Sequence, residues 1–365
     1  MTKNKRVLVA MSGGIDSSVA AILLHQQGYD LIGITMKTWD YDSSGGNGKE
    51  TGCCSLDSIN DARHLAVKIG FPHYIIDIRK EFGDKIINNF VDEYLIGRTP
   101  NPCVLCNTFI KWEALLKHAD ELDCDFIATG HYAKINEENG RYFISKGIDL
   151  AKDQSYVLWG ISQNNLKRTM FPLGKYNKTY IRELARKNGY LRLAEKKESY
   201  EICFIPDNDY RSFLKRKVDG LEAKVDGGDY VTSDGKIVGK HKGFPFYTIG
   251  QRKGLDIAMG EPYYVNSIDY ESNKVGIGPK SELMSNKMIV GKLNWQKHNS
   301  IKEGMLVSVQ IRHHDKGAMA RLYMHDKNVI RAEFESDVFA ITPGQSAVFF
   351  EGDDLLVGGF IIKKL

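Results

Sequence analysis

The stretch "VLVAMSGGIDSSVAAILL", residues 7–24, joins a short apolar run to a glycine turn and then to a longer apolar segment. The run that ends at Ala10 predicts a buried strand, and residues 12–14 predict a sharp turn. A helix is expected over 16–28, and "DLIGITM" (30–36) predicts a second strand. This β-α-β opening indicates a parallel sheet with right-handed crossovers.

The alternation of strand and helix continues beyond this opening. We expect strands at 73–78 and 125–132, and helices at 55–70, 81–97 and 106–122. These elements predict a doubly wound α/β domain over residues 1–165. Its ligands are expected at the carboxyl edge of the sheet.

Two further regions follow. Residues 166–225 read as a small helical central domain that is rich in basic side chains. From Asp226 the pattern changes to short strands separated by Gly, Asp and Asn turns, which predicts a β-barrel module over 226–365.

Composition limits the class of protein. The chain has 365 residues, of which 42% are hydrophobic and 26% charged, as in an ordinary globular protein. Its apolar runs are too short to span a bilayer, and its start lacks the features of a signal peptide. We therefore expect a cytoplasmic protein with no membrane partner. Six cysteines in a chain of this length do not predict a disulfide framework, so they are expected as thiols unless chemistry uses them.

Positive charge is concentrated in one region. Residues 167–217 hold 14 Lys and Arg against 6 Asp and Glu, although the whole chain has a formal net charge of only +4. This concentration suggests a polyanionic partner. The alternative interpretation, a solvated helical face, remains open.

The glycine turn has the chemistry of an anion site. Glycines bring consecutive N–H groups towards a phosphate, the helix N-terminus adds partial positive charge, and Ser12 and Ser17 add hydroxyl groups. The turn is neither a Walker A loop, because no Gly-Lys pair follows, nor a G-x-G-x-x-G turn.

The full S-G-G-x-D-S on strand, turn and helix resembles the PP-loop ATP pyrophosphatases, an adenine nucleotide alpha hydrolase-like fold. The resemblance implies cleavage of ATP between the α and β phosphates. Asp16 would orient or ligate Mg²⁺, with a helix N-cap as the alternative role. The residues expected to bind ATP are Ala10, Met11, Ser12, Gly13, Gly14, Ile15, Asp16, Ser17, Met36 and Gly130.

The cysteines allow several chemistries. Cys103 and Cys106 form a C-x-x-C, which serves zinc sites, redox pairs, iron–sulfur sites and sulfur relays. Zinc is disfavoured because no second close pair follows. Cys203 lies in a basic neighbourhood, where Lys196 and Lys197 would lower its pKa. Of the others, Cys53 and Cys54 lie in a Gly-rich loop, and Cys124 is expected to be a packed residue.

Seven sequence motifs, which occur in a fixed order along nearly the whole chain, narrow the resemblance to one family. They resemble the tRNA-specific 2-thiouridylases and are "AMSGGIDSSVAA", "GRTPNPCVLCN", "DFIATGHYA", "KDQSYVLW", "EICFIP", "GQRKGL" and "TPGQSAVF". The resemblance implies that ATP adenylates O2 of the wobble uridine, U34, and that a persulfide on Cys203 supplies sulfur. Cys106 would be its partner, and turnover would leave a Cys106–Cys203 disulfide, AMP and pyrophosphate.

The same resemblance implies partners and contacts. The substrates would be tRNAs for Lys, Glu and Gln, and sulfur would come from a cysteine desulfurase or a relay protein. Asn101, Pro102 and Cys103 would meet the target base. The residues implied in tRNA binding are His131, Lys152, Asp153, Gln154, Arg312, His313 and Gln345. His131 has a packed structural role as its alternative.

One position departs from the family. Many relatives have an aspartate where this chain has Cys103, and a thiol cannot serve as a carboxylate. Cys103 would then be a spectator, a participant in the thiol chemistry, or the third ligand of an iron–sulfur cluster with Cys106 and Cys203. Another PP-loop enzyme and a non-catalytic RNA-binding adaptor are the remaining alternatives.

Overall fold

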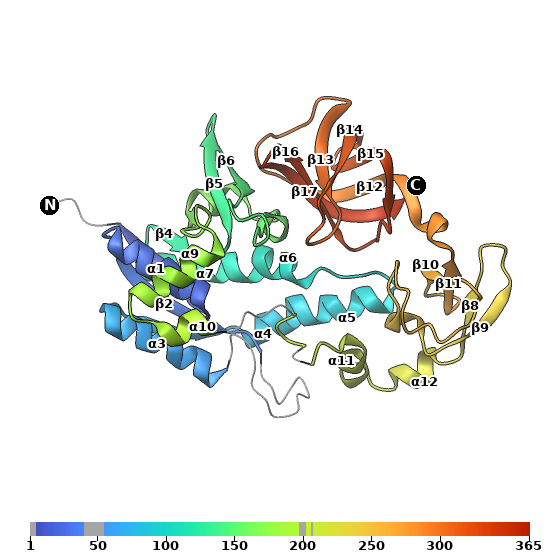
Figure 1. Cartoon of the computed structure of the whole chain (residues 1–365), viewed down its shortest axis with the longest axis horizontal. Helices are drawn as coiled ribbons and strands as arrows, with labels where there is room; N and C mark the ends of the chain where they lie inside the picture. The colour runs from blue at the N-terminus through green and yellow to red at the C-terminus, as the bar shows by residue number, and fades with distance from the viewer. Residues whose placement is uncertain (1–4, 40–54, 197–201, 206) are drawn as a thin grey trace. The chain divides into compact units, whose positions relative to one another are not determined.

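The computed structural model describes residues 5–39, 55–196, 202–205 and 207–365 (Figure 1). The chain forms two compact units. The first comprises residues 1–86, 103–208 and 353–356, and the second comprises 87–102, 209–352 and 357–365. No helix in the described ranges is both long enough and apolar enough to cross a membrane.

A five-stranded parallel sheet forms the centre of the first unit, with the order β3-β2-β1-β4-β7. Its strands are β1 (Arg6–Ala10), β2 (Asp30–Lys37), β3 (His73–Asp77), β4 (Phe126–Ala128) and β7 (Thr169–Met170). The predicted doubly wound α/β sheet is therefore confirmed. The predicted strand at 125–132 is shorter than expected, because the chain leaves the sheet after Ala128.

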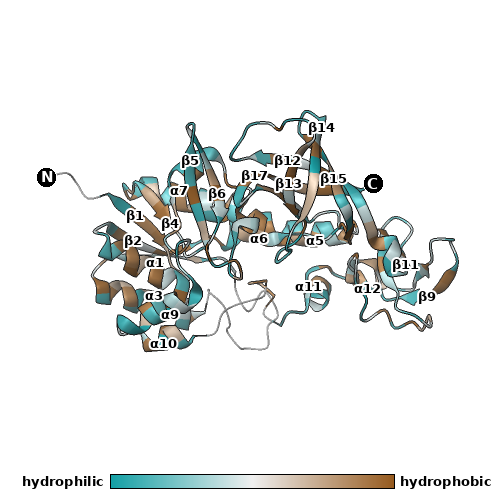
Figure 2. Cartoon of the chain, turned by 45° about the horizontal axis from the view of Figure 1, so that its top comes forward, coloured by the Kyte–Doolittle hydropathy of each residue, from teal (hydrophilic) through white to brown (hydrophobic). Residues whose placement is uncertain are grey.

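Helix α1 (Ile15–Gln26) is buried on most of its surface. With α3 (Leu56–Ile69), it packs on Val7 and Val9 of β1. Its opposite side meets α9 (Lys178–Lys187) and α10 (Leu191–Glu195). A helix covered on both sides must be apolar all round, which explains the run of hydrophobic residues in α1 (Figure 2).

The two helices predicted after β3 are both interrupted by π-helical turns. The first consists of α4 (Arg79–Phe82), η1 (Gly83–Ile87) and α5 (Asn88–Leu95). The second consists of α6 (Pro102–Cys106), η2 (Asn107–Lys111) and α7 (Trp112–Glu121). Such turns widen a helix locally and are frequent at functional sites.

A hairpin that the sequence interpretation did not include follows β4. Strands β5 (Ala133–Glu138) and β6 (Arg141–Lys146) pair in antiparallel fashion. Asn139 and Gly140 connect them, both with positive φ. This is the Asn-Gly hairpin turn, whose twist matches that of the flanking strands. Short helices η3 (Ser155–Leu158) and α8 (Gln163–Lys167) lead from the hairpin to β7.

The second unit contains α11 (Tyr210–Lys217), α12 (Leu221–Val225) and two sheets. The smaller sheet has the order β10-β11-β8-β9. Its strands are β8 (Gly228–Val231), β9 (Ile237–His241), β10 (Tyr264–Asp269) and β11 (Lys274–Gly278), and η4 (Phe244–Phe246) lies between β9 and β10.

Most of a six-stranded barrel also belongs to the second unit, as does α5. The barrel has the order β12-β15-β14-β13-β16-β17, and the pairing of β12 with β17 closes it. After η5 (Lys280–Leu283), its strands are β12 (Met284–Trp295), β13 (Met305–Gln310), β14 (Ala318–Asp326), β15 (Val329–Phe339), β16 (Ser346–Glu351) and β17 (Asp354–Lys364). The predicted C-terminal barrel is confirmed.

Two leucines on α3 test the packing against β1. Leu65 is 2% exposed and belongs to the core of the first unit, whereas Leu56 is 66% exposed on the same helix. We expect Leu65→Ala to lower the free energy of unfolding by about 2–5 kcal/mol. Leu56→Ala should change it by no more than about 0.5 kcal/mol. Urea unfolding followed by circular dichroism measures both; equal losses would contradict the packing described.

Candidate functional site

The turn between β1 and α1, residues 12–14 (the phosphate loop), is closed by its own hydroxyl groups. The Ser12 N–H donates to Oγ of Ser17 at 3.1 Å, and that hydroxyl donates to the Gly14 carbonyl at 3.2 Å. The Gly14 N–H lies 3.4 Å from Oγ of Ser12. In this structure the two serine hydroxyls thus shape the loop from within.

Gly13 is required by both conformation and space. Its φ is +65°, a left-handed value that favours glycine. A Cβ atom there would lie 1.9 Å from the carbonyl oxygen of Ser58 on α3. The loop is therefore pressed against α3, and no side chain fits between them.

The exit of β4 lies against the same loop. A Cβ atom on Gly130 would lie 2.7 Å from the backbone of Asp16 and of Ser17. Met36 lies near the carboxyl end of the neighbouring strand β2. The structure thus brings the expected ATP-binding positions from three parallel strands to one edge of the sheet, where ligands bind in such folds.

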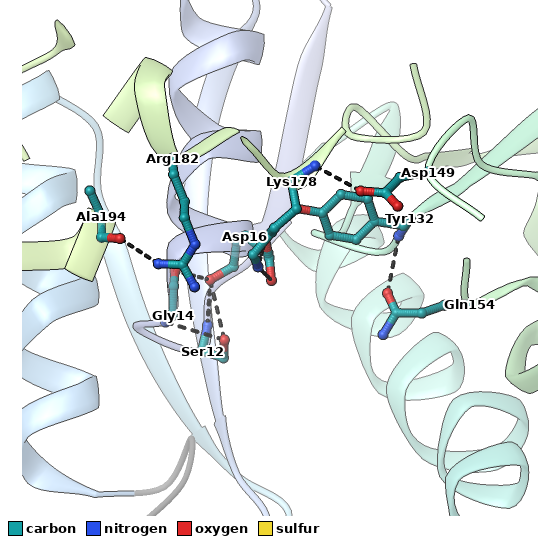
Figure 3. A network of polar contacts seen from close by, with 10 residues as sticks. Ser12, Gly14, Asp16, Tyr132, Asp149, Gln154, Lys178, Arg182 and Ala194 are labelled. Atoms are coloured by element: carbon teal, nitrogen blue, oxygen red, sulfur yellow. Dashed lines mark hydrogen bonds and ion pairs between the residues drawn. The ribbon is translucent and has the colours of Figure 1, made fainter. Parts of the chain in front are cut away.

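Asp16 lies in the first turn of α1, where an ammonium and a phenol meet its carboxylate (Figure 3). Nζ of Lys178 lies 2.7 Å from Oδ1 and 2.8 Å from Oδ2. The Tyr132 hydroxyl donates to Oδ1 at 2.7 Å. Gly14 is the N-cap residue of α1, so Asp16 does not cap it. A carboxylate engaged in this way also does not fit the expected role of a Mg²⁺ ligand.

A second lysine contacts the phosphate loop itself. Nζ of Lys196 donates to the Gly13 carbonyl at 3.0 Å and to Oδ2 of Asp61 at 2.8 Å. Lys196 was expected to lower the pKa of Cys203, but its ammonium is directed at the phosphate loop and α3. Lys197 lies outside the described residues.

Other basic side chains of the 167–217 stretch also have partners within their own unit. Arg168 pairs with Asp120, and Lys215 pairs with Glu222. Arg182 donates to the carbonyl of Ala194. Part of the local excess of positive charge therefore stabilises the fold.

Cys103 and Cys106 lie on α6, just before the π-helical turn η2. Cys106 is buried and Cys103 is exposed. Although solvent reaches the Cys103 side chain, the surrounding protein raises the pKa of its thiol by desolvation, and nearby Lys111 opposes this shift. Cys103 is therefore mainly a protonated thiol at neutral pH.

His131 follows β4 and is neutral. Burial, with a smaller contribution from Lys111, lowers its pKa well below the usual value. Its Nδ1 lies 2.7 Å from Oγ1 of Thr129, and its ring contacts those of Trp112 and Phe171. The packed role is thus observed, and the expected tRNA contact stays a prediction.

Cys203 lies on an anchored turn. Its side chain is exposed, whereas Phe204 and Ile205 beside it are each 1% exposed. The Phe204 ring packs edge-to-face on Phe82, and the Ile205 N–H donates to the carbonyl of Ile202. Cys203 thus presents an exposed side chain from a segment held by two buried neighbours. Cys53 and Cys54 lie outside the described residues.

Cys103, Cys106 and Cys203 belong to the same compact unit as the phosphate loop. Across the described ranges, however, no three His, Cys, Asp or Glu side chains gather in a group that could hold a metal ion. The structure therefore gives no support to an iron–sulfur cluster held by the three cysteines.

The triplet 152–154 is tied into the first unit. The Asp153 carboxylate accepts bonds from the Gly147 N–H and the Ser155 hydroxyl, although desolvation raises its pKa. Oε1 of Gln154 accepts from the Tyr132 N–H at 3.0 Å. These contacts fix the segment, and the contribution of Lys152 and its neighbours to tRNA binding stays a prediction.

The remaining predicted tRNA contacts lie in the second unit. Arg312 and His313 lie between β13 and β14, and Arg312 donates to the Phe339 carbonyl. Nε2 of Gln345 donates to the carbonyls of Thr99 and Pro100 at 3.1 and 2.9 Å. Gln345 therefore fixes the segment that leads to Asn101 and Pro102.

Sequence reasoning assigned no role to Tyr132 and Lys178, and it assigned Lys196 to Cys203 and not to this site. Tyr132 and Lys178 contact Asp16 across sequence separations of 116 and 162 residues, and Lys196 contacts Gly13 across 183. Their only sequence signals were the motif around His131 and the basic character of the central segment, and neither specifies a partner.

Comparison with known proteins assigns the parts of the chain to three family models. They are "tRNA methyl transferase HUP domain" over residues 5–207, "tRNA methyl transferase PRC-barrel domain" over 211–279 and "Aminomethyltransferase beta-barrel domain" over 285–361. These three models together cover most of the chain.

Full-length relatives are also similar. A tRNA-specific 2-thiouridylase MnmA of Amoebophilus asiaticus is 60% identical, covering 98% of this chain and 96% of the relative. One from Cytophaga hutchinsonii is 59% identical, covering 99% and 98%, and one from Salinibacter ruber is 55% identical, covering 99% and 95%. With such identity over nearly its entire length, the chain belongs to the tRNA-specific 2-thiouridylase family, a family of tRNA sulfurtransferases.

Proposed function

We propose that this protein catalyses the ATP-dependent 2-thiolation of the wobble uridine, U34, in tRNA. The observation that carries the proposal is that the phosphate loop, the C-x-x-C helix and the Cys203 turn all belong to one compact unit. The names of the close relatives support the same reaction.

The first step is adenylation. ATP binds at the phosphate loop, with its triphosphate at the N-terminus of α1 and its adenine at the carboxyl edge near Met36. The uridine leaves the anticodon stack to enter the site. Its O2 attacks the α-phosphate and pyrophosphate departs, which converts a poor leaving group at C2 into AMP.

The second step transfers sulfur. The terminal sulfur of a Cys203 persulfide attacks C2, the C2–O bond breaks, and AMP leaves. The Cys106 thiolate then attacks Sγ of Cys203, and the S–S bond breaks to leave 2-thiouridine and a Cys106–Cys203 disulfide. An external thiol reductant restores both thiols. Cys106 is buried here, so this step requires α6 or η2 to expose it.

Substrate and donor follow from the same proposal. The tRNAs for Lys, Glu and Gln are the expected acceptors, and a cysteine desulfurase, alone or through a carrier, is the expected source of the persulfide. Asn101, Pro102 and Cys103 would meet the extruded base, and the residues proposed to contact the rest of the tRNA are His131, Lys152, Asp153, Gln154, Arg312, His313 and Gln345.

Cysteine variants test the sulfur transfer. The assay combines the protein, ATP, a persulfide donor and unmodified tRNA, followed by nucleoside mass spectrometry. We expect Cys203→Ser and Cys106→Ser to reduce 2-thiouridine to background, since each removes one sulfur of the relay. Cys124→Ser is the control, because Cys124 is buried and has no role in the proposed reaction. Full thiolation by Cys203→Ser would refute the relay.

Cys103 is tested in the same assay. The Cys103 thiol is mainly protonated, and a spectator thiol takes no part in the reaction. We therefore expect Cys103→Ser to retain most of the activity. Loss comparable to that of Cys106→Ser would instead place Cys103 in the thiol chemistry, and anaerobic UV-visible spectra would then show whether a cluster is bound.

Two adjacent glycines test the phosphate loop. Gly13→Ala places a methyl group against the backbone of Ser58, whereas a Cβ atom on Gly14 has Oγ of Ser12 at 3.4 Å as its nearest neighbour. We expect Gly13→Ala to abolish ATP binding and Gly14→Ala to weaken it much less. Equilibrium binding of ATP measures both, with circular dichroism as the control for folding. Equal losses would mean that the Gly13–Ser58 contact is not what shapes the site.

A further inference from the structure

Asp16 brings a negative charge to a loop that is proposed to bind a polyanion. Its carboxylate lies in the first turn of α1, where the helix N-terminus would otherwise attract phosphate. The Asp16 carboxylate and a triphosphate bound in this loop would both be negative, and like charges that lie close together repel strongly. The repulsion is stronger where protein excludes water. A triphosphate in this loop therefore requires a counter-charge for Asp16.

Lys178 provides that charge from a separate helix. Its ammonium lies within 2.8 Å of both carboxylate oxygens, and its side chain is only 10% exposed, against 34% for that of Asp16. Burial of this kind makes an ion pair costly to break, because removing one partner leaves the other charge uncompensated.

The position of Lys178 is fixed by independent contacts. It is the first residue of α9, and its backbone N–H donates to Oδ2 of Asp149 at 2.9 Å. The side chain of the preceding residue, Asn177, caps the helix by accepting from the Tyr180 N–H. The ammonium also lies 5.5 Å from the centre of the Tyr132 ring.

Tyr132 restrains the other side of the pair. Its hydroxyl donates to Asp16, while its backbone exchanges two hydrogen bonds with Gln154 (Figure 3). Asp16 is thus held between two groups of the first unit whose own backbones are hydrogen-bonded to other segments. The geometry is that of a preorganised pair rather than of a carboxylate waiting for a cation.

We propose that Lys178 is a positioning residue for nucleotide binding. Its ammonium neutralises Asp16 and holds the first turn of α1, so that the loop presents net positive potential to the triphosphate. Asp16 is the anchor of Lys178 and does not ligate Mg²⁺. This inference rests on the proposed ATP site, but it makes no use of tRNA or of sulfur transfer.

The test is equilibrium binding of α,β-methylene-ATP, which is not cleaved between those phosphates, to the full chain without tRNA. In EDTA, we expect Lys178→Met to weaken binding by about tenfold or more, because Asp16 is left uncompensated. The affinity of the double variant Asp16→Asn/Lys178→Met should return to within about threefold of the wild type. In this double-mutant cycle, the second substitution removes the charge that the first leaves uncompensated. Lys178→Arg should stay close to the wild type.

Lys175→Met is the matched control, since Lys175 is exposed and lies three residues before Lys178. Circular dichroism and the thermal midpoint identify any variant that fails to fold; Lys178→Arg and the double variant then carry the test. A second measurement titrates Mg²⁺ with Asp16→Asn. We expect the Mg²⁺ concentration for half-maximal binding of the analogue to stay within about threefold of the wild type.

Two results would overturn the inference. One is a double variant that binds as weakly as Lys178→Met, because neutralisation would then not be the role of the lysine. The other is an increase of about tenfold in the Mg²⁺ requirement of Asp16→Asn, which would make Asp16 a metal ligand. A protein that binds the analogue as expected but forms no 2-thiouridine would count against the proposed function alone.

Discussion

The close contact between the phosphate loop and α3 is the constraint on which the rest of the site depends. Because Gly13 lies against the carbonyl of Ser58, no side chain fits at this point of the turn between β1 and α1. Residues far along the chain then bind to this turn and to the start of α1: Lys196 to the Gly13 carbonyl and Lys178 to Asp16. Lys178 of α9 and Lys196, which follows α10, therefore both contact a segment whose backbone geometry is set within a few residues.

Part of the positive charge of the central segment is neutralised by contacts inside the protein. A count of lysines and arginines is equally compatible with an RNA-binding surface and with internal ion pairs. Lys178 binds Asp16 of α1 and Lys196 binds the phosphate loop. Arg168 and Lys215 pair with nearby carboxylates. Net charge describes long-range attraction, but it does not show which cations are already neutralised.

Much of the fold could be predicted from sequence because its first elements are apolar runs bounded by glycines. The predicted strand ending at Ala10 agrees with β1, and the predicted 16–28 and 30–36 segments agree with α1 and β2 to within two residues at each end. The Asn139-Gly140 hairpin carries a recognisable turn signal in its Asn-Gly pair, whereas nothing local marks the π-helical turns η1 and η2. In the site, the glycine loop carries its own pattern. The Asp16–Lys178 and Asp16–Tyr132 contacts have none, because each joins residues more than a hundred positions apart. The structure divides into two compact units. The domain boundaries predicted at residues 165 and 225 stay predictions.

Because Gln345 lies near the end of the chain, its contacts with Thr99 and Pro100 can form only late in synthesis. The segment before the C-x-x-C helix is bonded through Thr99 and Pro100 to a side chain some 245 positions later. A nascent chain therefore carries that segment without its anchor until the last barrel strands have left the ribosome. Chains that terminate early, or that are trimmed within the barrel, would keep every reactive sulfur and still lack the support of the loop beside them.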